Sequence, residues 1–239
     1  MTASHSFQPI GIIGGMGPEA TVLLMSRIIA STQVQDDRDH IPLFVDNNPQ
    51  IPSRIKALLE KTGEDPGPVI ARMAKGLEKM GAKALAMPCN TAHHFADVIN
   101  KSATIPLLNM IELSMQKLIS MGLDKKTIGV LCSPAAREVG VFTSYADKHA
   151  IDLRFMQDET PLLRLIQHIK QVGADQEAQI QMHNICSQFI KDGIDALLIA
   201  CSELSLLANV VPKEIIYVDT VDVLANACVE YAGGQIRPT

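Results

Sequence analysis

The sequence lacks three features that would each assign a class at once: a long apolar run, an excess of positive charge and closely spaced cysteine pairs. No apolar stretch reaches the roughly 20 residues that a membrane-spanning helix needs. The 21 Lys and Arg against 26 Asp and Glu leave a net charge of −5, which favours neither nucleic acid nor an anionic membrane as a partner. Residues 1–9 have no basic stretch followed by an apolar one, so they predict no signal peptide.

Five cysteines are present, but none belongs to a Cys-x-x-Cys pair. This pattern fits neither a disulfide framework nor a zinc ribbon, and free thiols favour a reducing, cytoplasmic location. His93 and His94 are adjacent, so on a helix they point in different directions, and no further ligand lies at a suitable spacing. No metal site is therefore predicted. Cys186 and Cys228 fall within helical patterns and are expected in the core.

What the sequence has is an alternation of short apolar runs, rich in β-branched residues, with longer amphipathic segments such as 66–80 and 175–192. Strands separated by helices predict parallel sheets built from right-handed βαβ units, and 239 residues can bury a substantial core. The expected strands are Ile10–Ile13, Leu43–Asp46, Lys83–Met87 and Ile105–Leu108, then Thr127–Leu131, Asp152–Phe155, Ala196–Ala200 and Ile215–Val218.

These two series of strands are in register along the chain. Gly129 follows Gly11 by 118 positions, and Cys201 follows Cys89 by 112. A steady offset of about half the chain length indicates duplication of a four-stranded α/β unit. The alternative is a chance alignment of two generic βαβ patterns.

The segment 11–20, Gly-Ile-Ile-Gly-Gly-Met-Gly-Pro-Glu-Ala, predicts a strand, a glycine-rich turn and a helix that begins at Pro18. Glycines let backbone amides approach an anion closely. The turn also satisfies a loose dinucleotide fingerprint, which requires an acidic residue at the end of the second strand. Because Asp36, Asp37 and Asp39 precede that strand, we prefer a carboxylate-binding turn to dinucleotide binding.

Cys89 and Cys201 each end an apolar run and precede small polar residues that can begin a helix. Ligands of open parallel sheets bind beyond the carboxyl ends of the strands, and the amides at a helix N-terminus favour a thiolate. Asn90 and Thr91 are good capping residues that could equally bind a small anion. A lone cysteine here would most often be inert core. Two thiols from matching halves could instead approach one carbon from opposite faces, as a cofactor-free racemase requires.

The sequence alone leaves the roles of four further residues open. Arg54 follows the loop after the second strand, where its guanidinium could bind a carboxylate or simply be solvated. Lys170 ends an amphipathic helix and by itself indicates surface charge. Glu203 could interact with a helix dipole or orient a substrate. Cys132 lies at a strand end and could approach the cleft, but it has no partner in the other half.

With these motifs laid out, the chain resembles the aspartate/glutamate racemase superfamily, specifically its aspartate racemase branch. The resemblance implies two pseudo-symmetric flavodoxin-like units, each a four-stranded parallel sheet flanked by helices, with the active site in the cleft between them. The expected units are residues 1–109 with 219–239, and residues 110–218. The motifs that carry the resemblance are Gly11–Thr21, Asn48–Arg54, Met87–His93, Cys201–Leu204 and Val218–Ala225.

The resemblance also implies PLP-independent racemisation of aspartate or glutamate in a homodimer, without a cofactor or metal. Cys89 and Cys201 would be the acid–base pair. The substrate-binding residues it implies are Asn90, Thr91 and Ser202 at the α-carboxylate, near the Met16 turn, with Arg54 and Lys170 at the side-chain carboxylate.

The chain departs from the family pattern in two places. Ala200-Cys-Ser-Glu203 stands where the family usually has Gly-Cys-Thr-Glu, although serine keeps the hydroxyl. The segment 132–138 lacks a threonine-rich turn, which leaves the side-chain preference open. The alternatives are a glutamate racemase, which Leu204 argues against because a histidine is usual there, a hydantoin racemase, a maleate isomerase with one nucleophilic cysteine, or a non-catalytic protein that binds acidic amino acids.

Overall fold

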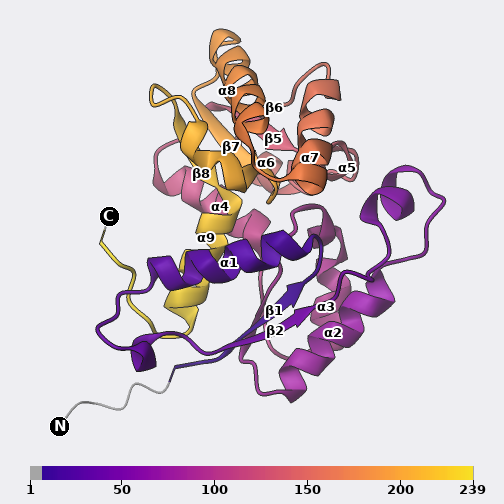
Figure 1. Ribbon diagram of the computed structural model, residues 1–239, viewed down its shortest axis with the longest axis vertical. Coiled ribbons are helices and arrows are strands. Elements are labelled where there is room, and N and C mark those ends of the chain that lie inside the picture. The colour runs from indigo at the N-terminus through magenta and orange to yellow at the C-terminus, as the bar shows by residue number, and fades with distance from the viewer. Residues whose placement is uncertain (1–6, 239) are drawn as a thin grey trace. The chain divides into compact units, whose positions relative to one another are not determined.

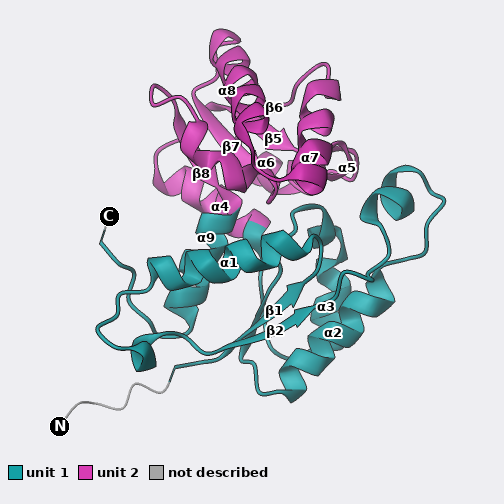
Figure 2. Cartoon of the chain, in the orientation of Figure 1, with its two compact units in different colours: residues 1–110, 221–239 teal, residues 111–220 magenta. Residues whose placement is uncertain are grey.

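The computed structural model describes residues 7–238 (Figure 1). The chain divides into two compact units, Met1–Met110 with Val221–Thr239, and Ile111–Thr220 (Figure 2). Each unit contains one four-stranded sheet in which every pairing is parallel. The expected fold class, two four-stranded parallel sheets flanked by helices, is confirmed.

In the first unit the strand order is β2-β1-β3-β4. Helix α1 lies on one side of β1 and β2, and α2 and α3 lie on the other (Figure 1). The strands are β1 (Ile10–Gly14), β2 (Leu43–Asn47), β3 (Ala84–Ala86) and β4 (Leu107–Leu108). The helices are α1 (Pro18–Ser31), α2 (Gly67–Lys79), α3 (Ala96–Ser102) and α9 (Thr220–Tyr231), with the short helices η1 (Asp37–Asp39), η2 (Ile55–Leu59) and η3 (Thr91–Phe95).

The local sequence explains these elements. All five residues of β1 are buried, as expected for a parallel strand covered on both faces. Helix α1 begins at Pro18, as predicted, with Gly17 as its N-cap. Helix α2 buries a stripe at helical spacing that includes Ile70, Met73 and Leu77, and this stripe faces the sheet and α3.

In the second unit the order is β6-β5-β7-β8. Its main core lies between the sheet and helices α7 and α8, which pack against each other. The strands are β5 (Thr127–Cys132), β6 (Asp152–Arg154), β7 (Ala196–Ala200) and β8 (Ile216–Asp219). The helices are α4 (Met110–Ser120), α5 (Pro134–Glu138), α6 (Thr143–His149), α7 (Thr160–Val172) and α8 (Gln176–Lys191), with η4 (Leu204–Val210).

The packing around one glycine is repeated in the two units. Gly11 in β1 and Gly129 in β5 each sit so close to three neighbours that an added Cβ would lie between 2.7 and 3.1 Å from their side chains. Each neighbour in the second unit follows its counterpart by 112 positions, the same offset that separates Cys89 from Cys201. The matching neighbours are Leu77 and Phe189, Ala82 and Ile194, and Leu85 and Leu197.

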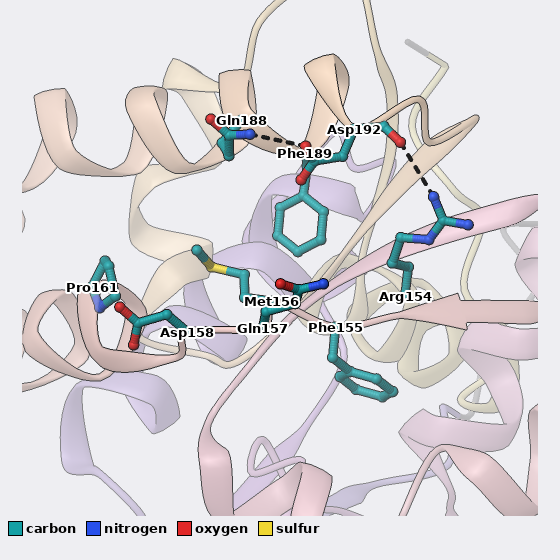
Figure 3. A pocket seen from close by; sticks show the side chains of 9 residues that line it. All are labelled: Arg154, Phe155, Met156, Gln157, Asp158, Pro161, Gln188, Phe189 and Asp192. Atoms are coloured by element: carbon teal, nitrogen blue, oxygen red, sulfur yellow. Dashed lines mark hydrogen bonds between the residues drawn. The ribbon is translucent and has the colours of Figure 1, made fainter.

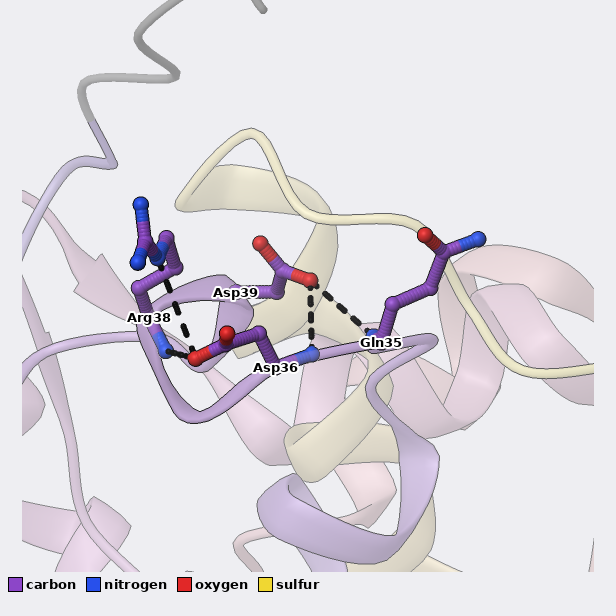
Figure 4. A network of polar contacts seen from close by, with 4 residues as sticks. All are labelled: Gln35, Asp36, Arg38 and Asp39. Carbon is purple, nitrogen blue, oxygen red and sulfur yellow. Dashed lines mark hydrogen bonds and ion pairs between the residues drawn. The ribbon is translucent and has the colours of Figure 1, made fainter.

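The acidic segment before β2 forms a small self-contained turn (Figure 4). The carboxylate of Asp39 accepts hydrogen bonds from the amides of Gln35 and Asp36, both at 3.0 Å. The carboxylate of Asp36 accepts from the amide of Arg38 in return, which completes a capping box around η1. Asp36 and Asp39 therefore bond the backbone of their own turn and have a structural role, although they lie near the position where a dinucleotide fingerprint requires an acidic residue.

Candidate active site

Three segments of the first unit begin at the same edge of its sheet. Strand β1 lies between β2 and β3, and all three run parallel, so their carboxyl ends meet at one edge. The glycine-rich turn follows β1, the loop containing Asn48 follows β2, and Cys89 follows β3. Ligands of open α/β sheets bind at this edge.

The glycine-rich turn is held against the end of β2. The amide of Gly15 donates to Thr21 Oγ1 at 2.9 Å, and Thr21 Oγ1 donates to Asn47 Oδ1 at 3.0 Å. Gly15 has a φ of 93°, and an added Cβ would lie 2.2 Å from the carbonyl oxygen of Asn48. Glycine is therefore required here by the close approach of two loops. The buried Met16 comes next in this turn.

Cys89 lies in a tight turn just after β3. Its amide donates to the carbonyl oxygen of Met87 at 2.8 Å, and the residue is only 8% exposed. The expected helix after it begins as η3 and continues as α3. Asn90 is buried and Thr91 is half-buried beside it.

His93 connects this cysteine turn to the start of α4. The amide of Met110 donates to His93 Nε2 at 3.2 Å, so the ring proton is on Nδ1, which donates to the carbonyl oxygen of Cys89 at 2.9 Å. Burial lowers the pKa of His93 to about 4. The imidazole is therefore neutral near pH 7, and its observed role is to position the turn that carries Cys89.

Arg54 lies between β2 and α2, immediately before η2. Its Nη1 donates to the carbonyl oxygens of Ile51 and Pro52, at 3.4 and 3.0 Å. The guanidinium is thus held by its own loop, and a role toward a substrate stays a prediction.

In the second unit, Cys201 follows β7 and makes a side-chain contact that sequence reasoning missed. Its Sγ donates to Glu203 Oε2 at 3.1 Å, while Glu203 Oε1 pairs with Lys170 Nζ on α7, also at 3.1 Å. Cys201 is 7% exposed, the Glu203 side chain is 10% exposed and the Lys170 side chain is 47% exposed. Lys170 is therefore the counter-ion of a nearly buried carboxylate.

Burial raises the pKa of the Cys201 thiol well above its ordinary value of 9.0, and the Glu203 carboxylate raises it further. Lys170 acts in the opposite direction. The backbone amide of Glu203 also lowers the pKa of this thiol, as expected of amides at a helix start, but burial and the Glu203 carboxylate outweigh it. The segment that follows it, η4, is a short 3-10 helix.

The turn around Cys201 is fixed by hydrogen bonds to the end of β8. The carbonyl oxygen of Cys201 accepts from the amides of Leu204 and Ser205, at 2.9 and 3.2 Å. Ser205 Oγ donates to Asp219 Oδ1 at 2.7 Å, with both residues buried, and Ser202 is buried beside them. Asp219 lies in the motif 218–225, so the sequence had indicated that it belongs near the site. Nothing in the sequence indicated that Ser205 would be its partner.

The other three thiols are inert core groups. Cys132 ends β5, and burial together with Glu159 raises its pKa to about 12. Burial alone raises the pKa values of Cys186 and Cys228 to about 12 as well. All three stay protonated at neutral pH, which agrees with the core positions expected for Cys186 and Cys228.

Across residues 7–238, no group of three or more His, Cys, Asp or Glu side chains is arranged to hold a metal ion. None of the helices within this described part of the chain is both long enough and apolar enough to cross a membrane.

A cavity of about 640 Å³ in the second unit is lined by none of the candidate site residues described above (Figure 3). Its polar groups largely bond one another: Gln188 Nε2 donates to Asp192 Oδ1 at 2.9 Å, and Arg154 Nη1 donates to the Asp192 carbonyl oxygen at 3.2 Å. Neither Cys201 nor Lys170 lines it, so it is a poorer candidate than the cysteine turns. Its lining residues are Arg154, Phe155, Met156, Gln157, Asp158, Pro161, Gln188, Phe189 and Asp192.

The chain thus consists of two α/β units, each with a parallel sheet and a buried cysteine just after its third strand. This repeated arrangement defines its class, a duplicated α/β protein. Residues 13–228 match the family model described as Asp/Glu/Hydantoin racemase. The chain belongs to this family, and the expected family membership is confirmed.

Similar proteins agree with this assignment. The solved structure of Picrophilus torridus aspartate racemase matches with a TM-score of 0.87 and 29% identity, covering 96% of each chain. A broad specificity amino-acid racemase, RacX of Bacillus subtilis (strain 168), is 24% identical over 235 residues, which are 92% of this chain and 96% of that protein. A glutamate racemase from Francisella tularensis, solved in complex with D-glutamate, shares the fold at a TM-score of 0.62 and 19% identity, covering 93% of this chain and 80% of that one. The family and these relatives indicate an isomerase that acts on amino acids.

Proposed function

We propose that the protein is a cofactor-independent racemase of an acidic amino acid, aspartate or glutamate, and that Cys89 and Cys201 are its two bases. The observation that carries the proposal is the placement of these thiols. Each follows the third strand of its unit, each is nearly buried, and they are separated by the offset that also relates the packing around Gly11 and Gly129. The substrate class is supported by the similarity to an aspartate racemase over 96% of both chains.

In the proposed reaction one thiolate removes the α-proton, and the other thiol gives a proton to the opposite face of the same carbon. The Cα–H bond breaks and an S–H bond forms, which leaves an electron pair that delocalises into the α-carboxylate. The second S–H bond then breaks as the new Cα–H bond forms. The roles of Cys89 and Cys201 exchange for the other enantiomer.

The carbanion is the difficult species, because no electron sink such as pyridoxal takes part. Acid–base transfer by itself contributes only about 10²–10⁴-fold. The rest must come from preorganised donors around the α-carboxylate in a site that excludes water. We assign this role to the turns that carry Asn90, Thr91 and Ser202, and to the Met16 turn.

Arg54 and Lys170 are proposed to select a side-chain carboxylate. The fork of donors on a guanidinium suits bidentate carboxylate binding. Lys170 already holds one carboxylate, that of Glu203, at 3.1 Å. Replacing Arg54 by Ala should therefore raise KM for aspartate more than it lowers kcat.

The proposal also covers the assembly, location and partners of the protein. We expect a homodimer in the cytoplasm, with a small acidic amino acid as its partner and neither nucleic acid nor membrane bound.

The test incubates the purified protein with L-aspartate or L-glutamate in deuterated water and follows α-deuterium and the D-isomer by mass spectrometry. Cys89→Ala and Cys201→Ala should each abolish racemisation with an unchanged circular dichroism spectrum. Cys186→Ala, which removes an inert thiol from the same unit as Cys201, is the matched control and should stay active. Full activity in Cys201→Ala would refute the two-base scheme, and binding without loss of the α-proton would favour a non-catalytic binding protein.

A broader substrate range is the second candidate, because one relative is a broad specificity amino-acid racemase. The same incubation with neutral and basic L-amino acids decides between the two. Racemisation of those substrates at comparable rates would favour the broader range.

A further inference from the structure

Glu203 and Lys170 form a chain of contacts that ends on the sulfur of Cys201. Cys201 Sγ donates to one carboxylate oxygen of Glu203, and Lys170 Nζ pairs with the other, each at 3.1 Å. The three residues come from two different elements, the turn after β7 and the last part of α7. A hydrogen bond between a thiol and an ionised carboxylate requires the proton to be on the sulfur.

The charged groups around this thiol act in opposite directions. The carboxylate of Glu203 opposes formation of a second negative charge beside it, whereas the ammonium of Lys170 favours that charge. Three titratable groups on the neighbouring elements are either bonded to other partners or held protonated by burial. Asp219 on β8 accepts from Ser205, His168 on α7 pairs with Asp175 at 2.9 Å, and Cys132 on β5 is protonated.

We propose that Glu203 is a positioning residue that holds Cys201 as the protonated thiol in the resting protein, while Lys170 balances the Glu203 charge. Within the two-base scheme, on which this inference rests, Cys201 is then the resting proton donor and Cys89 the resting base. The resting protein therefore acts first on the enantiomer whose α-hydrogen faces Cys89.

The proton balance explains why both residues are needed. When Cys201 gives its proton to the substrate carbon, its thiolate is left 3.1 Å from a carboxylate oxygen, which would be strongly repulsive. Lys170, the counter-ion of that carboxylate, reduces this repulsion and so lowers the free energy of the Cys201 thiolate. Glu203 thus sets where the proton rests, and Lys170 sets how easily it leaves. The resting state returns when Cys89 releases its proton to water and the Cys201 thiolate takes up a proton from water.

The test measures the thiolate population of Cys201 without any substrate. In a Cys89→Ala background, the rate of alkylation of Cys201 by iodoacetamide is measured across pH by peptide mass spectrometry. Removing a like charge at this range lowers a pKa by about 1 to 3. Because nucleophilicity falls by about half as much on a logarithmic scale, Glu203→Gln should accelerate alkylation at neutral pH by about 3- to 30-fold.

Lys170→Gln should change the rate in the opposite direction and slow the alkylation of Cys201. This opposition separates the inference from a merely structural role, because a loosened turn would accelerate alkylation in both variants. Glu177→Gln is the matched control, since Glu177 is an exposed carboxylate of the same unit bonded to Gln181, and it should leave the rate unchanged.

The inference is overturned if Cys201 titrates at or below the ordinary thiol pKa of 9.0 with Glu203 present. It is also overturned if Glu203→Gln leaves the alkylation rate unchanged, or if both variants shift it in the same direction. Because alkylation needs no substrate, the expected rates combined with an absence of α-deuterium exchange would count against the proposed function alone.

Discussion

Replacing His93 by Gln should change how the stability of the protein depends on pH. His93 is buried, its ring is neutral, and it bonds both the carbonyl oxygen of Cys89 and the amide of Met110. Its pKa is lowered from 6.5 to about 4 in the folded protein. An unfolded chain therefore binds more protons at this side chain than the folded protein does throughout the interval between those two values.

The size of the effect follows from the same two pKa values. Each step of one in pKa corresponds to about 1.4 kcal/mol, so the free energy of unfolding should fall by about 3 kcal/mol as the pH falls from above 6.5 to about 4. Above pH 6.5 this contribution is fully present. The carboxylates of Asp158, Asp175 and Asp195 each accept a hydrogen bond from a backbone amide, which lowers their pKa values below the ordinary 3.8, so their contribution is lost mainly below this window.

Urea denaturation at a series of pH values measures the free energy of unfolding for the wild type and for His93→Gln. At pH 7.5, a value chosen about one unit above the ordinary pKa, the variant should be less stable by about 1–3 kcal/mol, because buried hydrogen bonds are lost. The gap between the two proteins should narrow toward pH 4 as the wild type loses its histidine contribution.

Parallel stability curves for the two proteins between pH 4 and 6.5 would refute the reasoning. They would show that His93 titrates alike in the folded and unfolded chains and that its burial does not control its charge. His183, an exposed histidine bonded to the carbonyl oxygen of Val210, offers the matched control. His183→Gln should retain the wild-type pH dependence.

Two further predictions concern the packing that positions the turns. Gly129→Ala should destabilise the protein by about 1–3 kcal/mol, because its Cβ would lie 2.7 Å from Phe189. Gly76→Ala, in an exposed helical position with nothing within 4 Å, should stabilise it by about 0.5–1 kcal/mol. Thermal denaturation compares the two variants, and equal effects would contradict the packing argument. Thr21→Val should cost about 1–3 kcal/mol because the buried Gly15 amide loses its acceptor, while Thr21→Ser, which keeps the hydroxyl, should cost less; urea denaturation of both variants checks this order.

Much of the fold could be predicted from sequence because its signals are local. A buried parallel strand is a short apolar run such as 10–14, and an amphipathic helix such as α2 repeats its apolar positions with a helical period. Duplication added a second signal, since a constant offset relates residues that occupy equivalent places. The location of Cys89 and Cys201 after corresponding strands follows from these patterns.

The side-chain contacts at those cysteines could not be predicted in the same way. His93 bonds an amide 17 positions along the chain, and Lys170 reaches a carboxylate on a segment 33 positions away (170 to 203). Arg54, a candidate substrate ligand by its type, donates to two carbonyl oxygens of its own loop. No spacing in the sequence encodes which of several possible partners a flexible charged side chain will meet.

The sequence by itself therefore determined the α/β architecture, the repeat and the positions of the two thiols, because periodicity and offset are properties of the chain. Only the tertiary structure decided the state of the Cys201 thiol. Its proton affinity depends on how far packing removes the sulfur from water and on the carboxylate placed 3.1 Å from it, and both are set by elements that meet only after folding.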